Sequence, residues 1–275
     1  MLIINLNNHT MKKGKKLWIL LFSISFISTV VISCSSDDGG DAETMNDDDI
    51  TQEGVTELHA AFAEFDSERV EVTLSEDGTE YTITSNGRPN HETAYYPDDH
   101  ELWRNEPDVE LTAGGSTRIE EDRDYEVTLT VDTTPNLDGD PVVTEINEIG
   151  IAVSGGYIYN NLEGPVDLTE ETAESLDYTG GHIGPSNYHY HLEPEAFSFD
   201  DSSLIGILLD GVFIYGRRCE TTDDYPTDLD SSGGHTHVTS FSNGEEEYHY
   251  HMINEPFFGD GTDDYLIFEG PYLGF

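Results

Sequence analysis

Short runs in which apolar and polar residues alternate mark the first part of the chain. The alternation covers residues 70–74, 81–83 and 127–131. Side chains two residues apart point to the same face of a strand, so this period predicts half-buried β-strands. Asp77-Gly78 and Asn86-Gly87 supply turn signals beside them. Helical periodicity is weak, and Ala and Glu favour only a short helix at 58–65.

Two later segments repeat each other. Residues 150–159 read GIAVSGGYIY and residues 206–215 read GILLDGVFIY, each an apolar strand, a tight turn and a second aromatic strand. Each of these predicted β-hairpins is followed by GGH, then YHYH, then Glu-Pro. The same order occurring twice predicts a duplication, with internal repeats at about 150–194 and 206–256. Neither half is large enough to bury a core alone. We therefore expect an all-β fold, in which duplicated hairpin or meander units pack into one β-sandwich or barrel-like domain.

The N-terminal segment reads as a targeting signal. Lysines at positions 12–16 precede an apolar run from Leu17 to Ile32, which ends in V-I-S-C at Cys34. This run is short for a membrane-spanning helix. The pattern resembles the lipobox of bacterial lipoproteins, and the resemblance implies a signal peptide at 1–33 and a lipid on Cys34 that attaches the protein to a membrane. Residues 34–55 are expected to form an acidic disordered tether ahead of a domain at 56–275.

The excess of acidic residues in the chain bears on its binding partners and on its location in the cell. The chain carries 57 acidic residues and 11 basic ones, and four of the basic residues are the lysines of the signal, which leaves seven arginines after it. Such a negative surface repels phosphate backbones, so nucleic acid is not an expected partner. Ser35-Ser36-Asp37-Asp38 resembles the acidic surface-export signal of lipoproteins in Bacteroidetes-type bacteria. We expect a lipid anchor in the outer membrane, with the cell surface favoured over the periplasmic face.

Histidine carries the candidate chemistry. Seven of the 11 histidines fall in the two repeats: His182, His189, His191, His235, His237, His249 and His251. In a strand, the two histidines of each YHYH motif project from one face and the two tyrosines from the other. Neutral imidazole is the commonest metal ligand, and three or four of them suit a divalent transition metal such as copper or zinc. We expect the tyrosines to pack in the core or to orient the ligands.

The segments GGHIGPSNYHYHL, GGHTH and EYHYHM together resemble the YHYH family of bacterial exported proteins. SNGRPNHET at 85–93 and the two hairpins resemble that family as well, so the resemblance runs from about Val70 to the C-terminus. It implies an exported protein without a defined activity. Because His91 lies in this family-like segment, we include it as a further candidate ligand. Cys219 has no partner if Cys34 is lipidated, and is expected to be a free thiol or to bridge two molecules.

Three functions remain open from the sequence. The first is a metal-binding module at the cell surface or in the periplasm, holding copper or zinc. The second is a metal-dependent hydrolase or a copper oxidoreductase built on the same histidines, with Glu193, Glu247 or Asp210 as a base. The third is an adhesion or glycan-binding β-domain with structural metal, in which Trp103 would contact sugar. If the repeats pack face to face, we expect them to build one shared site.

Overall fold

A computed structural model describes residues 54–111, 118–184, 187–259 and 264–275. The predicted signal peptide, Cys34 and nearly all of the predicted tether lie outside these residues. Within them, no helix is both long and apolar enough to cross a membrane. The secondary structure consists of short strands and two single-turn helices. These elements are η1 (Ala60–Glu64), β1 (Val70–Leu74), β2 (Glu80–Ser85), β3 (Val127–Asp132), β4 (Gly150–Ala152), β5 (Tyr157–Ile158), β6 (Leu162–Glu163), β7 (Val166–Asp167), α1 (Glu170–Ala173), β8 (Gly181–Ile183), β9 (Tyr188–Tyr190), β10 (Leu204–Leu208), β11 (Phe213–Tyr215), β12 (Gly234–Val238) and β13 (Glu246–His251).

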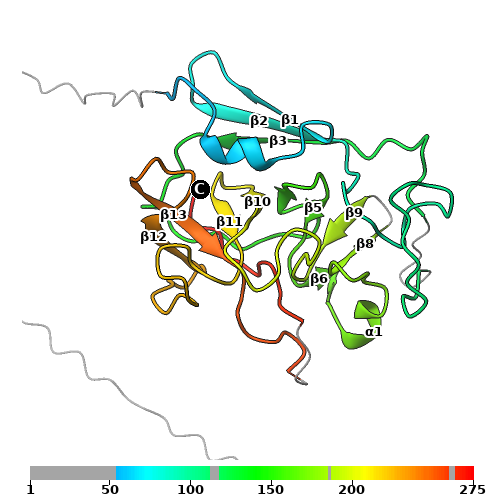
Figure 1. Ribbon diagram of the computed structural model, residues 1–275. Coiled ribbons are helices and arrows are strands. Elements are labelled where there is room, and N and C mark those ends of the chain that lie inside the picture. Colours follow the sequence, from blue (N-terminus) through cyan, green and yellow to red (C-terminus); the bar gives the residue numbers. More distant parts are fainter. Residues whose placement is uncertain (1–53, 112–117, 185–186, 260–263) are drawn as a thin grey trace, which may run out of the picture. The chain divides into compact units, whose positions relative to one another are not determined.

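The strands form two main sheets. The first has the order β1-β2-β3, and the second has the order β12-β13-β11-β10-β4-β5-β9-β8. β1, β2 and β3 lie over one face of the larger sheet (Figure 1). Apolar residues of both sheets, such as Ile83, Leu129 and Ile207, share one buried cluster between them. The prediction of an all-β fold is confirmed, and the packing is that of a sandwich. The larger sheet is open, because β12 and β8 form its two edges in the described chain.

The larger sheet has an internal two-fold arrangement. In the first half β4 pairs with β5, and β5 runs parallel to β9; in the second half β10 pairs with β11, and β11 runs parallel to β13. The halves meet where β4 and β10 pair antiparallel, with Ile151 opposite Ile207. Gly150 lies opposite Leu208 and Gly206 opposite Ala152, so each repeat presents the same register to the other.

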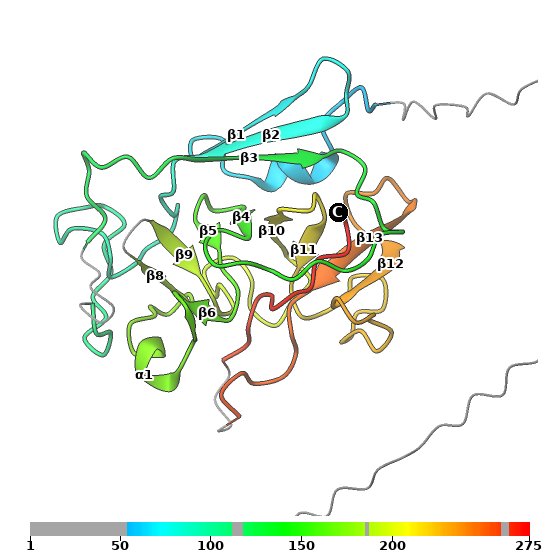
Figure 2. The same cartoon turned by 180° about the vertical axis from the view of Figure 1, so that it is seen from behind.

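The two faces of the larger sheet bury different side chains. Tyr188, Tyr190 and Tyr250 point into a core on the face away from β1, β2 and β3. Because side chains alternate along a strand, His189 takes the other face, beside its cross-strand neighbour Tyr157. The β8–β9 pair and the β12–β13 pair lie at opposite edges of the sheet, as both views show (Figures 1 and 2). The histidines of the two repeats are therefore held on one face of the sheet, near its two ends.

Candidate metal sites

Four donor side chains converge at the first edge of the sheet, in what we call the Glu163 site. It comprises Glu163, His182, His189 and His191. His189 Nε2 lies 3.0 Å from His182 Nε2 and 3.1 Å from His191 Nε2. Glu163 Oε2 lies 3.2 Å from the Nε2 atoms of His182 and His191. Zinc–nitrogen bonds of about 2.0–2.1 Å place the donors of a tetrahedral ion about 3.3–3.4 Å apart. The measured separations are close to that range.

The hydrogen bonds made by the Nδ1 atoms of these rings determine which ring nitrogen carries the proton and which carries the lone pair. His191 Nδ1 donates to the carbonyl oxygen of Asn160 at 2.6 Å, and His189 Nδ1 donates to that of Asn187 at 3.2 Å. His182 Nδ1 contacts the Ser175 hydroxyl at 2.8 Å. That hydroxyl donates to the Thr172 carbonyl, so it accepts from His182. Each ring in its neutral form therefore carries its proton on Nδ1, and all three Nε2 lone pairs point at one another.

The second edge carries an equivalent set, the Cys219 site, formed by Cys219, His235, His249 and His251. His235 Nε2 lies 3.1 Å from His251 Nε2. The Nδ1 atoms again donate outward. The acceptors are the Gly216 carbonyl for His251 (2.7 Å), the Glu247 carbonyl for His249 (2.9 Å) and an Asp228 carboxylate oxygen for His235 (2.9 Å). The second repeat thus reproduces the first, with sulfur in place of the carboxylate.

The GGH and YHYH motifs are tied together in the same way in both repeats. Asp177 accepts from the Tyr188 hydroxyl and from the Gly181 amide. Asp230 accepts in the same way from Tyr248 and Gly234. In the first repeat a side chain at Gly181 would place its Cβ 2.7 Å from the Tyr188 oxygen. The glycine therefore lets the tyrosine hydroxyl reach the aspartate, which aligns the histidine of GGH with the two of YHYH.

Burial lowers the pKa of four of these imidazoles, two in each repeat. It lowers the pKa of His182 and lowers that of His189 well below the usual value. In the second repeat burial lowers the pKa of His249 and of His251 to about 4. A neutral imidazole is the form that binds a metal ion, so burial prepares these four rings as ligands near neutral pH.

The structure brings together six of the eight predicted ligands in these two sites. His237 lies beside the Cys219 site, with Nδ1 3.4 Å from Cys219 Sγ and Nε2 3.4 Å from an Asp228 oxygen. Asp228, His235 and His237 also form a third, more exposed group of possible ligands. His91 lies in none of these groups. Its ring packs on the tyrosine face of β9, with Nε2 2.6 Å from the Tyr190 hydroxyl, so the structure does not bring it together with the other predicted ligands.

Glu163 and Cys219 were not among the ligands predicted from the sequence. Cys219 is a free, buried cysteine. The signal was present in the repeat, because Glu163 and Cys219 both follow the hairpin tyrosine, Tyr159 or Tyr215, by four residues.

The expectation of one shared site is wrong, because the histidines of the two repeats lie in separate groups. The two halves join through β4 and β10, and four strands separate β9 from β13. Five strand-to-strand spacings of about 4.8 Å therefore lie between β9 and β13, which puts the two sites on the order of 25 Å apart. The two repeats thus pair through their hairpin strands, β4 and β10, and not through the strands that carry the histidines.

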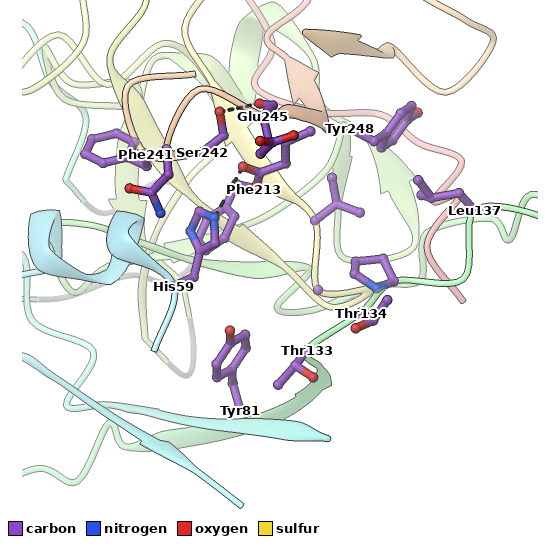
Figure 3. Close-up of a pocket in the computed structure, with 15 residues that line it drawn as sticks. His59, Tyr81, Thr133, Thr134, Leu137, Phe213, Phe241, Ser242, Glu245 and Tyr248 are labelled. Carbon is purple, nitrogen blue, oxygen red and sulfur yellow. Dashed lines mark hydrogen bonds and ion pairs between the residues drawn. The ribbon is translucent and has the colours of Figure 1, made fainter. Parts of the chain in front are cut away.

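A separate pocket of about 420 Å³ lies beside the second half (Figure 3). Tyr81, Thr133, Phe213 and Tyr248 help to line it, and His59 contacts Glu247 there at 3.3 Å. None of the histidines of the two sites lines this pocket. This pocket and the converging ligands are therefore different places on the molecule.

The residues named for the alternative functions have other partners. Glu193 forms a buried ion pair with Arg217 at 3.1 Å, and Asp210 accepts from the Tyr250 hydroxyl at 2.6 Å. Glu247 pairs with His59. Trp103 is half-buried and packs against the core. Neither site has one of these carboxylates among its four donors.

Comparison with known proteins identifies one family. Residues 128–228 match the family model described as YHYH protein, so the resemblance inferred from the motifs is confirmed over this part of the chain. The match includes the whole Glu163 site and Cys219, and it ends before His235. No curated protein and no solved structure matches the chain.

Proposed function

We propose that this protein binds two transition-metal ions, copper or zinc, one in the Glu163 site and one in the Cys219 site. The observation that carries the proposal is the arrangement of the six histidines. Every Nδ1 donates to an oxygen, so every Nε2 presents a lone pair to the other donors of its site.

Without a cation, this arrangement is unfavourable. His182, His189 and His191 are each no more than 3% exposed, so water does not readily solvate their inward nitrogens. A buried acceptor without a partner costs about 1–3 kcal/mol. Glu163 Oε2 is also buried without a hydrogen bond. A divalent cation at the centre would satisfy all four donors at once.

The proposal includes a location outside the cytoplasm. It is supported by the lysines at 12–16, the apolar run that follows them and the V-I-S-C sequence at Cys34. We propose a lipoprotein of the outer membrane whose domain binds metal at the cell surface or in the periplasm.

Metal content of the purified protein tests the proposal. After reconstitution at neutral pH with copper or zinc, followed by removal of free metal, elemental analysis should find two ions per chain. The double variant His189→Asn with His191→Asn removes two Nε2 donors and keeps an amide near each Nδ1 position. It should lose the ion of the Glu163 site and keep the other. The His91→Ala variant is the control and should keep both ions. Absence of bound metal in the folded wild-type protein would refute the function.

A further inference from the structure

The two sites differ at three equivalent positions, and in the second repeat all three lie in or next to the Cys219 site. Asn160 and Gly216, whose carbonyls hold His191 and His251, are 56 residues apart. Glu163 and Cys219 are separated by the same 56 residues. Cys219 therefore occupies the place of the carboxylate, and the duplicated scaffold has exchanged one donor atom for another.

The second difference lies behind the His235 ring, and the third lies beside the Cys219 sulfur. His182 and His235 are 53 residues apart, and so are the groups that accept from their Nδ1 atoms, the Ser175 hydroxyl and the Asp228 carboxylate. At the same offset, His237 replaces Gly184. A Cβ at Gly184 would lie 2.9 Å from the His189 ring, so the first site has no room for this histidine.

These exchanges alter the donor set that a metal would meet. Thiolate is a soft ligand that suits copper as well as zinc, and thiolate with imidazoles is the donor set of copper electron-transfer centres, whose potential is tuned by hydrogen bonds around the sulfur. His237 Nδ1 is placed to make such a contact at 3.4 Å. A carboxylate with three imidazoles is a donor set that zinc accepts in tetrahedral geometry. The Asp228 carboxylate behind His235 makes that ring a more basic ligand than a hydroxyl would.

We propose that the two sites are specialised for different metals, the Glu163 site for zinc and the Cys219 site for copper. This rests on the proposed function and adds the identity of each ion. In the Cys219 site the thiolate and three imidazoles bind copper, and His237 positions the sulfur without binding the ion. Cys219 is 1% exposed, which keeps a second molecule from reaching the sulfur to form a disulfide.

Reciprocal substitution tests the assignment. Wild-type protein reconstituted with zinc and cupric ion together should hold one ion of each and show a thiolate-to-copper charge-transfer absorption. Cys219→Glu should lose that absorption and hold two zinc ions. The double variant Glu163→Cys with Cys219→Glu should regain the absorption, now abolished by His191→Asn and not by His251→Asn.

Other outcomes overturn the inference. A wild-type protein that binds two ions with the same preference at both sites, or that binds copper without a thiolate absorption, would show that the sites are not specialised. A protein that binds no ion would refute the proposed function itself. If the double variant fails to fold, Cys219→Ser serves instead, because it should lose the copper absorption and keep zinc in the Glu163 site.

A second variant tests the role of His237. His237→Phe should leave zinc binding unchanged while shifting the copper absorption and the reduction potential, because it removes the contact to the sulfur. An unchanged spectrum and potential in a copper-loaded variant would show that His237 does not act on the sulfur.

Discussion

Single residues explain why six histidines direct their Nε2 atoms into the two candidate sites and the others do not. A histidine that follows a strand residue by two places finds that residue's carbonyl beside its Nδ1, as His189 does with Asn187 and His249 with Glu247. The His-x-His spacing could therefore be read from the sequence. Glu163 lies in β6 and Cys219 lies after β11, so neither belongs to the histidine strands. Only their equivalent positions, four residues after Tyr159 and Tyr215, could have revealed them. His91 was predicted as a ligand from its place in the family-like segment of the sequence, which does not indicate which face of the sheet its side chain contacts.

Removal of one inward nitrogen should empty one site only. We expect His191→Asn to lower the metal content from two ions to about one, because His191 Nε2 lies at tetrahedral-edge distances from His189 and Glu163. His100→Ala, at a ring that stacks on Tyr96, is the matched control and should keep two ions. Elemental analysis measures both, and equal metal content in the two variants would contradict the assignment.

The metal-free protein should lose stability on mild acidification. The pKa of His249 and of His251 in the folded state is about 4, below the value near 6.5 in the unfolded chain. Between these values the unfolded chain binds more protons than the folded chain. The contribution of these two histidines to the free energy of unfolding is therefore complete above about pH 6.5 and falls as the pH drops toward 4. The loss should reach about 3 kcal/mol for each histidine.

Urea unfolding of the metal-free protein at several pH values measures this loss. The variant with His249→Gln and His251→Gln should show a flatter profile over the same range. An identical slope in the variant and the wild type would mean that other groups cause the acid sensitivity.

At the scale of elements, local pairing was predictable and parallel pairing was not. The alternation at 70–74 predicted β1, and the repeated apolar-turn-aromatic pattern predicted the β4–β5 and β10–β11 hairpins. The parallel contacts of β5 with β9 and of β11 with β13 join segments about 30 residues apart. No local sequence pattern predicts such a contact, because it depends on the path of the loops that connect the two strands.

The central pairing of β4 with β10 requires glycine. A Cβ at Gly206 would lie 2.2 Å from the Ile151 carbonyl oxygen. We expect Gly206→Ala to cost about 1–3 kcal/mol through overpacking and to lower the melting temperature. Gly164→Asn is the control, because nothing lies within 4 Å of that position and Asn tolerates its φ of +58°. Equal melting temperatures of the two variants would show that the strands move apart at little cost.

On the scale of the whole molecule, the two sites should act independently. They lie at opposite edges of one sheet, and substitutions more than about 10 Å apart without shared partners usually add. A cycle built from the Asn variants of His189 and His191 and those of His249 and His251 should give a coupling energy near zero in metal affinity. Each double variant should lose one ion and bind the other with unchanged affinity. A coupling above about 0.5 kcal/mol would show communication through the sheet.

Membrane attachment should depend on Cys34. If the lipid on this residue is the anchor, Cys34→Ala should move the protein from the membrane fraction to the soluble fraction or stall its processing. Fractionation followed by immunoblotting measures this, with Cys219→Ser as the cysteine control that stays in the membrane. A processed Cys34→Ala protein that remains in the membrane would argue against lipidation.

The symmetric register at the centre of the sheet bears on how the protein arose. Ile151 faces Ile207, its own counterpart in the other repeat, and both are fully buried. In an ancestor with a single repeat, this strand would have faced the same strand of a second polypeptide, which is how an isologous homodimer is built. Gene fusion would then have freed the two halves to diverge. A carboxylate in one and a thiol in the other is a difference that an identical pair of subunits cannot have.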